Sequence, residues 1–128
     1  MTVYDLVHSR LGIQNDALVV TDPRAGSKDG LIVFAMNWCH YCRQNEPVFK
    51  AAAAECPNHL FFRVEGTTNP KLLEIAQQDF YLKDGKKTSV TGFPTIFYFE
   101  KGGRITELYT GSRTVEAYTR FLKGKVRH

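Results

Sequence analysis

The sequence predicts an α/β fold with a central mixed β-sheet and helices on both faces of that sheet. Short apolar runs of the kind found in strands alternate along the chain with segments whose apolar residues have helical spacing. Near the end, Gly102 and Gly103 join two strand-like runs, which indicates an antiparallel hairpin. The length of 128 residues fits a single domain over 1–128, with its core at about 17–123.

The first predicted elements are a helix and two strands. Residues 3–11 carry apolar side chains at helical spacing, and Gly12 follows them as a stop. Residues 17–21 are a β-prone run, and turn-forming residues fill 22–30. Residues 31–36 are apolar throughout, which predicts a strand buried on both faces, as in the centre of an α/β sheet.

The middle of the chain is expected to add a helix, a strand and a second helix. Residues 40–56 place apolar side chains on one helical face, and Pro47 lies inside this helix. Residues 60–65 have the pattern of a second central strand. Pro70 is favoured in the first turn of a helix, and the helix that it opens is expected to run to about Phe80.

The last third is expected to hold a loop, a hairpin and a helix. Residues 81–89 are polar and rich in turn formers, which predicts an exposed loop or insertion. Residues 95–99 and 105–109 have the aromatic and β-branched side chains typical of strands. A last helix is expected over 113–123, with its apolar face turned inward.

The charge pattern argues against a specific nucleic-acid partner. The net charge is +4, and the internal basic residues are scattered among acidic ones. A nucleic-acid site would instead gather basic residues with aromatic ones on one element. Part of the excess lies at residues 124–128, which we expect to form a solvated basic tail.

The expected location is the cytoplasm. No apolar run approaches the roughly 18–20 residues of a membrane span, so no membrane partner is expected. The first residues lack a basic region followed by an apolar stretch, and so do not resemble a secretory signal. The alternative is a secretory compartment, for a chain from which a leader has been removed.

The chain has three cysteines, and an odd count argues against a framework of structural disulfides. Cys39 and Cys42 form a C-x-x-C pair, a spacing typical of redox-active or metal-binding sites. Zinc needs four ligands and the chain has no second pair of this kind, so no metal is expected. Cys56 lies on the inward face of a predicted helix and is expected to be a buried, unreactive thiol.

The position of the pair predicts redox chemistry. Cys39 follows a buried strand and begins a helix, where unpaired backbone N–H groups and the helix dipole stabilise a thiolate. Cys39 is therefore the expected nucleophile. Cys42 is the expected resolving thiol, which closes the redox-active disulfide with Cys39. The dithiol itself carries the electrons, so no cofactor is expected.

The two residues between the cysteines leave alternatives open. His40 can carry a charge near neutral pH, which would stabilise the Cys39 thiolate. The alternative is an exposed imidazole without a tuning role. Tyr41 is expected to be a packing or substrate-contact ring rather than a chemical group, and we count both residues among those that contact substrate.

These features together resemble the thioredoxin superfamily. The resemblance is carried by a Trp-Cys-x-x-Cys motif after an apolar strand, a proline five residues beyond the second cysteine, a later Gly-Phe-Pro-Thr and a Gly-Gly turn. Finer matches resemble the catalytic, a-type domains of protein disulfide isomerases. The matching segments are Trp38–Cys42, Pro47, Arg63–Thr67, Gly92–Thr95, Gly102–Gly103 and Tyr109–Thr114.

The resemblance implies further site residues. Pro94 would be a cis proline that faces the cysteine pair, and the backbone at Phe93 would pair with a substrate strand. Trp38 would line the substrate groove. Arg113 would swing toward the second cysteine and help it to react; the alternative is a solvated charge at a helix start.

The chain departs from the family in three places. The family has a buried acid six residues before the first cysteine, where this chain has Val33. The usual proton acceptor for Cys42 is thus missing, and Arg63 is expected to lack its counter-ion. The His-Tyr insert differs from Gly-His and Gly-Pro, so the redox direction does not carry over. The segment 80–89 is longer than usual and is expected to shape substrate or partner choice.

The leading function is a thiol–disulfide oxidoreductase that acts on protein disulfides, of the isomerase or oxidase kind. One alternative is a cytosolic disulfide reductase of the thioredoxin type. The other is a thioredoxin-fold module that holds client proteins with little turnover. The expected partners are protein thiol or disulfide substrates and an upstream redox protein, and the chain is expected to be a monomer.

Overall fold

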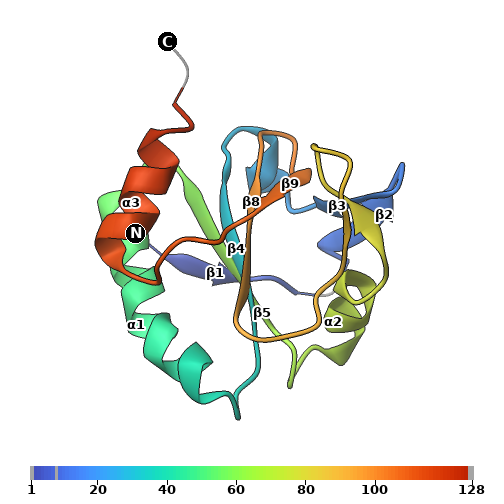
Figure 1. Ribbon diagram of the computed structural model, residues 1–128, viewed down its shortest axis with the longest axis horizontal. Coiled ribbons are helices and arrows are strands. Elements are labelled where there is room, and N and C mark those ends of the chain that lie inside the picture. Colours follow the sequence, from blue (N-terminus) through green and yellow to red (C-terminus); the bar gives the residue numbers. More distant parts are fainter. Residues whose placement is uncertain (1, 8, 127–128) are drawn as a thin grey trace.

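A five-stranded mixed sheet runs through the middle of the molecule (Figure 1). The computed structural model describes residues 2–7 and 9–126. The strands of the sheet are β1 (Val3–Asp5), β4 (Gly30–Ala35), β5 (Leu60–Glu65), β8 (Thr95–Phe99) and β9 (Ile105–Leu108). Their order is β1-β5-β4-β8-β9; β4 pairs in parallel with β5 and β5 with β1, whereas β8 is antiparallel to β4 and β9.

Helices cover both faces of the sheet, as predicted. Figure 1 shows α1 (His40–Glu55) and α3 (Val115–Lys123) on one side and α2 (Pro70–Ala76) on the other. Two smaller antiparallel pairs, β2 (Leu11–Gln14) with β3 (Ala17–Val20) and β6 (Phe80–Tyr81) with β7 (Lys87–Thr88), complete the strands. A short 3-10 helix spans Pro23–Gly26.

The sheet separates two apolar cores. Side chains alternate along β4, so Leu31 and Val33 pack with α1 and α3, while Ile32 and Phe34 pack with α2 and the smaller strands. All six residues of β4 are buried, which confirms the predicted central strand. On the helical side, the hydroxyl of buried Tyr118 in α3 donates to the side-chain oxygen of Asn45 in α1.

The helix predicted over 3–11 is wrong. Strand β1 pairs with β5, and the chain later enters β2, which pairs with β3. Leu6 is buried and its N–H donates to the carbonyl of Arg63, whereas Val7 is 57% exposed. The helical spacing was misleading because a distant strand, β5, satisfies the backbone here. Leu6 and Leu11 also extend the core before the predicted boundary at residue 17.

The segment after α2 also differs from its prediction. Helix α2 ends at Ala76, and Phe80 begins a short strand. The expected exposed loop over 81–89 is largely a hairpin: β6 pairs with β7, and Phe80 and Leu82 are buried. Residues 83–87, from the tip of the hairpin into the start of β7, are exposed as predicted. Phe80 packs edge-on against Phe97, which fixes the hairpin on the sheet.

The predicted solvated tail is partly packed on the protein, because Lys125 contacts Glu107 and Tyr98. Helix α3 begins at Val115 rather than at 113, because the side chain of Thr114 caps it by accepting from the N–H of Ala117. The Lys125 ammonium pairs with Glu107 and lies 4.9 Å from the centre of the Tyr98 ring. The last two residues of the predicted tail, 127 and 128, lie outside the described residues.

None of the helices that the structure describes is long and apolar enough to cross a membrane.

Candidate active site

The cysteine pair lies where β4 gives way to α1. Cys39 is the residue before the first turn of α1, and its Sγ accepts a hydrogen bond from the N–H of Cys42 at 3.2 Å. The N–H of Cys39 in turn donates to the carbonyl of Met36. A sulfur in this position meets the unpaired N–H groups and the positive end of the helix dipole, which favour a thiolate. Cys39 therefore lies where the sequence predicted it, at the start of a helix.

The two cysteines of the pair differ in what they contact. Both are buried at 6% exposure, and all three cysteines of the chain are thiols. Burial raises the pKa of the Cys42 thiol, and the neighbouring Cys39 sulfur adds to the effect. Cys42 therefore needs help to lose its proton. Cys56 is buried behind the end of α1, and burial raises the pKa of its thiol as well, as expected for an unreactive group.

The loop before β8 lies against the pair. The Phe93–Pro94 peptide bond is cis, as the resemblance implied. The Sγ of Cys39 lies 3.7 Å from the carbonyl oxygen of Phe93, and Phe93 packs against the buried cluster of Ala35 and the two cysteines. The hydroxyl of Thr95 donates to the carbonyl of Gly92 at 2.6 Å, which closes the loop on itself.

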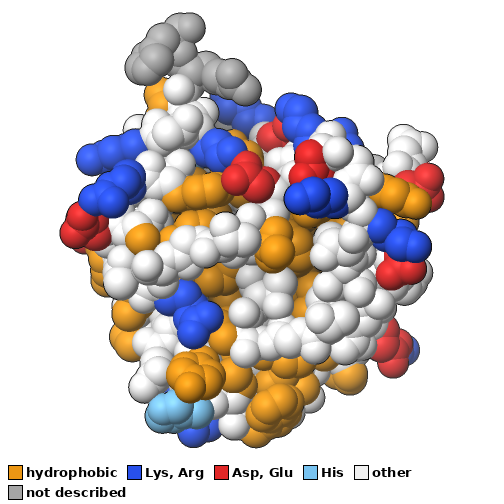
Figure 2. Space-filling view, in the orientation of Figure 1, with side chains coloured by type: hydrophobic (Ala, Val, Ile, Leu, Met, Phe, Trp, Pro, Cys, Tyr) orange, Lys and Arg blue, Asp and Glu red, His pale blue; other side chains and the backbone are white. Residues whose placement is uncertain are grey.

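Exposed aromatic rings surround the entrance to the pair. Trp38 is 64% exposed and Tyr41 is 59% exposed. The Trp38 ring meets the Phe93 ring edge-on, with centroids 6.2 Å apart, and the exposed His40 ring packs against Tyr41 in the same manner. Figure 2 shows hydrophobic side chains gathered at the lower edge of the molecule, together with a histidine and basic side chains. That edge is where the chain passes from β4 into α1 in Figure 1.

Arg113 comes from the segment before α3 and reaches the same edge. Its guanidinium carbon lies 5.7 Å from the centre of the Tyr41 ring, within cation–π range. A cavity of about 510 Å³ lies between them, lined also by Gln44 and Asn45. The structure thus brings Arg113 to the insert between the cysteines, although its side chain is exposed.

The site behind Cys42 corrects one expectation. Val33, a residue without a carboxylate, occupies the position of the family's buried acid, and it is buried at 3% exposure. Arg63, however, does not lack a counter-ion: its guanidinium bonds Asp5 at 2.7 Å and Glu46 at 2.8 Å. Glu46 is four residues beyond Cys42 and hence on the same helical face, a signal that the sequence carried. Asp5 could not have been found from spacing, because it lies in a strand that was predicted as a helix.

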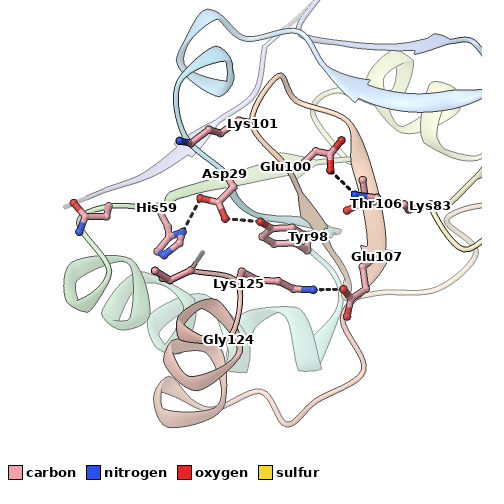
Figure 3. A pocket seen from close by; sticks show the side chains of 12 residues that line it. Asp29, His59, Lys83, Tyr98, Glu100, Lys101, Thr106, Glu107, Gly124 and Lys125 are labelled. Carbon is pink, nitrogen blue, oxygen red and sulfur yellow. Dashed lines mark hydrogen bonds and ion pairs between the residues drawn. The ribbon is translucent and has the colours of Figure 1, made fainter. Parts of the chain in front are cut away.

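Another cavity is remote from the cysteines. It has a volume of about 930 Å³ and lies beside Asp29 and His59, which directly precede β4 and β5. Figure 3 shows Asp29 between His59 and Tyr98, and its carboxylate bonds both of them. Cys39 follows the other end of β4, so this cavity does not belong to the redox site. Among residues 2–7 and 9–126, no group of three or more His, Cys, Asp or Glu side chains is placed to hold a metal ion.

Curated relatives of this chain are protein disulfide isomerases. The chain is 31% identical to "Protein disulfide-isomerase erp38" of Neurospora crassa, over 91% of this chain and 30% of that protein. It is 30% identical to "Probable protein disulfide-isomerase A6" of Medicago sativa, over 78% of this chain and 25% of that protein. The chain thus spans a quarter to a third of these relatives. These names give no support to the cytoplasmic location expected from the sequence.

Solved structures show the same fold. The Trx4 domain of ERdj5 superposes with a TM-score of 0.66 at 16% identity, over 96% of this chain and 94% of that one. Human ERp44, form I, superposes with a TM-score of 0.68 at 19% identity, over 98% of this chain and 30% of that one. The family model of thioredoxin matches residues 19–124. With its cysteine pair at the start of α1 and a cis proline beside it, the chain belongs to the thioredoxin family.

Proposed function

We propose that this chain is a thiol–disulfide oxidoreductase that acts on protein disulfides, in the manner of a protein disulfide isomerase or oxidase. Cys39 is the nucleophile. Its thiolate attacks a substrate disulfide, forms a mixed disulfide and releases one substrate thiolate, which takes a proton from solvent. Cys42 then attacks the Cys39 sulfur, the Cys39–Cys42 disulfide forms, and the second substrate sulfur leaves. In the oxidising direction the same steps run in reverse.

One observation carries the proposal: the Cys39 sulfur accepts the N–H of Cys42 at the start of α1, at 3.2 Å. This contact stabilises negative charge on Cys39, whereas burial raises the pKa of the Cys42 thiol. This difference supports attack by the first cysteine and resolution by the second. The proposed reaction, thiol–disulfide exchange, also agrees with the names of the curated relatives, which are protein disulfide isomerases.

The substrate is proposed to bind across the rings that surround the pair. The carbonyl of Phe93 lies beside the Cys39 sulfur, so a substrate strand that bonds the backbone there would bring its disulfide to the nucleophile. Trp38, His40 and Tyr41 offer exposed rings at the same edge. Backbone pairing and aromatic contact bind many peptide sequences, as a general disulfide exchanger requires.

Two assays test the enzyme. The wild-type chain should accelerate both the reduction of insulin by dithiothreitol and the recovery of activity by a ribonuclease with scrambled disulfides. Cys39→Ser should reduce both to the uncatalysed rate. The matched control is Cys56→Ser, which removes a thiol far from the pair and should leave both rates unchanged. Uncatalysed rates for the wild-type chain would overturn the proposal.

A redox titration of the Cys39–Cys42 couple separates the direction of the reaction. A couple distinctly more oxidising than the cytosolic glutathione pool supports the oxidase or isomerase. A couple as reducing as that pool supports a reductase of the thioredoxin type.

One observation favours a second candidate, a client-binding module with little turnover. Val33 leaves the region behind Cys42 without the buried acid of the family. A module of this kind would hold unfolded proteins through Trp38 and Tyr41 while the assays above proceed at the uncatalysed rate.

The compartment proposed for this chain is the secretory one. Disulfides form and persist in oxidising compartments, so similarity to protein disulfide isomerases favours the secretory alternative over the cytoplasm. The proposed partners are protein thiols and disulfides together with an upstream redox protein that recharges the pair. Fractionation of the native cells, probed with an antibody against this chain, tests the location. Sedimentation of the purified chain tests the proposed monomer.

A further inference from the structure

A cavity of about 560 Å³ lies behind the cysteine pair, and Cys42 is part of its wall. Val33 and Phe49 form apolar parts of the lining, whereas Glu46 and Arg63 supply charged groups. This cavity differs from the substrate-facing edge, because Trp38, Tyr41 and Phe93 do not line it. It therefore offers the buried Cys42 thiol a second route to solvent.

Glu46 is fixed in this cavity by a chain of ion pairs. It lies one helical turn beyond Cys42, and its carboxylate bonds the Arg63 guanidinium at 2.8 Å. Asp5 holds the same guanidinium from the other side, at 2.7 Å. The contacts join α1, β5 and β1, so the position of the Glu46 carboxylate is set by three elements. Glu46 is nevertheless 51% exposed in its side chain and can return a proton to solvent.

Of the other charged groups that face the cavity, Glu65, Asp5 and Arg43 have partners of their own. The carboxylate of Glu65 accepts the N–H groups of Thr67 and Thr68 and stabilises the turn after β5. Asp5 is committed to Arg63. The cations of the lining are Arg63 itself, Lys50 and Arg43, whose guanidinium donates to the carbonyl of Asn37. Glu46 is the carboxylate of this cavity that shares a helical face with Cys42.

We propose that Glu46 is the proton acceptor for Cys42, with Arg63 as its positioning residue. The inference rests on the proposed exchange reaction and deepens it. During resolution the Cys42 S–H proton passes through solvent in the cavity to the Glu46 carboxylate. The Cys42 thiolate then attacks the Cys39 sulfur, and the Cys39–substrate bond breaks. The substrate sulfur leaves as a thiolate and takes a proton from solvent, and Glu46 returns its proton to solvent.

This arrangement replaces a buried carboxylate in the sheet by a carboxylate on α1. Val33 keeps the floor of the cavity apolar, which maintains the high proton affinity of the Cys42 thiol between turnovers. Resting Cys42 therefore stays protonated, and the proton leaves when the mixed disulfide has formed.

The test measures attack and resolution separately in a single turnover. The substrate is a peptide disulfide with a fluorophore on one half and a quencher on the other, and attack by Cys39 separates the two halves and restores the fluorescence. A second dye, on the half that stays bound to Cys39, reports the release of that half by Cys42. Glu46→Gln should slow release by about tenfold or more at pH 6–7 and leave attack unchanged, because a general base typically contributes a factor of this order or larger. Above about pH 9, where hydroxide competes for the proton, the two release rates should converge.

Chemical rescue distinguishes a proton acceptor from a merely structural contact. Added acetate, at constant pH and ionic strength, should restore part of the release rate of Glu46→Gln and leave the wild-type rate unchanged. The matched control is Glu55→Gln, which removes an exposed carboxylate from the end of the same helix and outside the cavity. Its release rate and pH profile should be those of the wild type.

The outcomes separate this inference from the proposed function. A wild-type chain without exchange overturns the proposed function. A wild-type chain that exchanges, with Glu46→Gln folded and unchanged in release, overturns only the role of Glu46. Slower release that is equal at all pH values and is not rescued by acetate also overturns it, because it points to a loss of position rather than of a base.

Discussion

The sulfur of Cys39 lies 3.7 Å from the carbonyl oxygen of Phe93, although the two residues are 54 positions apart in the chain. The contact joins the junction of β4 and α1 to the loop before β8. It places the proposed nucleophile beside the backbone group that would bind a substrate strand. A substrate held there by backbone pairing presents its disulfide directly to Cys39.

The first prediction concerns covalent trapping. Cys42→Ser should accumulate mixed disulfides with a protein that contains scrambled disulfides, because Cys39 still attacks and no second thiol releases the substrate. Cys39→Ser should accumulate none. Non-reducing gel electrophoresis followed by mass spectrometry measures the adducts. Equal trapping by the two variants would contradict the assignment of attack and resolution, and Cys56→Ser serves as the control with wild-type behaviour.

The second prediction concerns Val33. In a chain that also carries Glu46→Gln, Val33→Glu should raise the release rate at pH 7 by about fivefold or more, because it places a carboxyl group on the wall of the same cavity. The change should also lower the free energy of unfolding by about 2 kcal/mol, since a polar group enters an apolar core. Urea unfolding and the single-turnover assay measure the two effects. A folded double variant that releases substrate as slowly as Glu46→Gln alone would count against the proton route.

The third prediction concerns the hairpin of β6 and β7. Phe80→Ala should lower the free energy of unfolding by about 3–5 kcal/mol, because the ring is fully buried and packs against Phe97. The control is Lys86→Ala at the exposed tip, where a change within about 0.5 kcal/mol is expected. Denaturant unfolding compares the two. A small effect for Phe80→Ala would favour the loosely attached loop that the sequence first indicated.

The fourth prediction concerns acid stability. Asp22 is buried, and the Arg24 guanidinium bonded to its carboxylate holds the pKa of that group below its ordinary value of 3.8. In the pH range between the folded and unfolded pKa values the unfolded chain binds more protons. The stability from this contact is therefore fully present above about pH 4 and is lost as the pH falls through the folded value.

Asp22→Asn should consequently lose stability at pH 7 and lose less on further acidification than the wild type. Asp79→Asn, at an exposed carboxylate, is the control and should follow the wild-type pH profile. Guanidinium unfolding at pH 7 and pH 3 provides the comparison. Parallel losses for wild type and Asp22→Asn between these pH values would refute the role of this ion pair.

Local patterns predicted the centre of the site correctly. The apolar run that became β4, the amphipathic pattern of α1 and the cysteine pair between them are neighbours in the sequence. Their geometry follows from strand burial, helix periodicity and the N–H groups of a first helical turn. Cys39 therefore had a predictable position, and its proposed role as the nucleophile is argued from that position.

The errors arose where partners are distant. Residues 3–11 have a helical apolar spacing, but parallel pairing with β5 makes residues 3–5 a strand. The polar composition of 81–89 concealed that Phe80 and Leu82 attach the hairpin to the core. The spacing of apolar residues shows which face of one segment can be buried. It does not show which other segment will pack against that face.

By itself, the sequence determined the fold class and the position of the cysteine pair, and it predicted the order of attack, because these depend on residues close together in the chain. Only the tertiary structure decided what surrounds the pair. It brought Phe93 to the Cys39 sulfur, placed Arg113 over Tyr41 and joined Glu46 to Arg63 behind Cys42. Each of these contacts depends on the packing of separate strands and helices, and a partner chosen by packing leaves no periodic signal in the sequence.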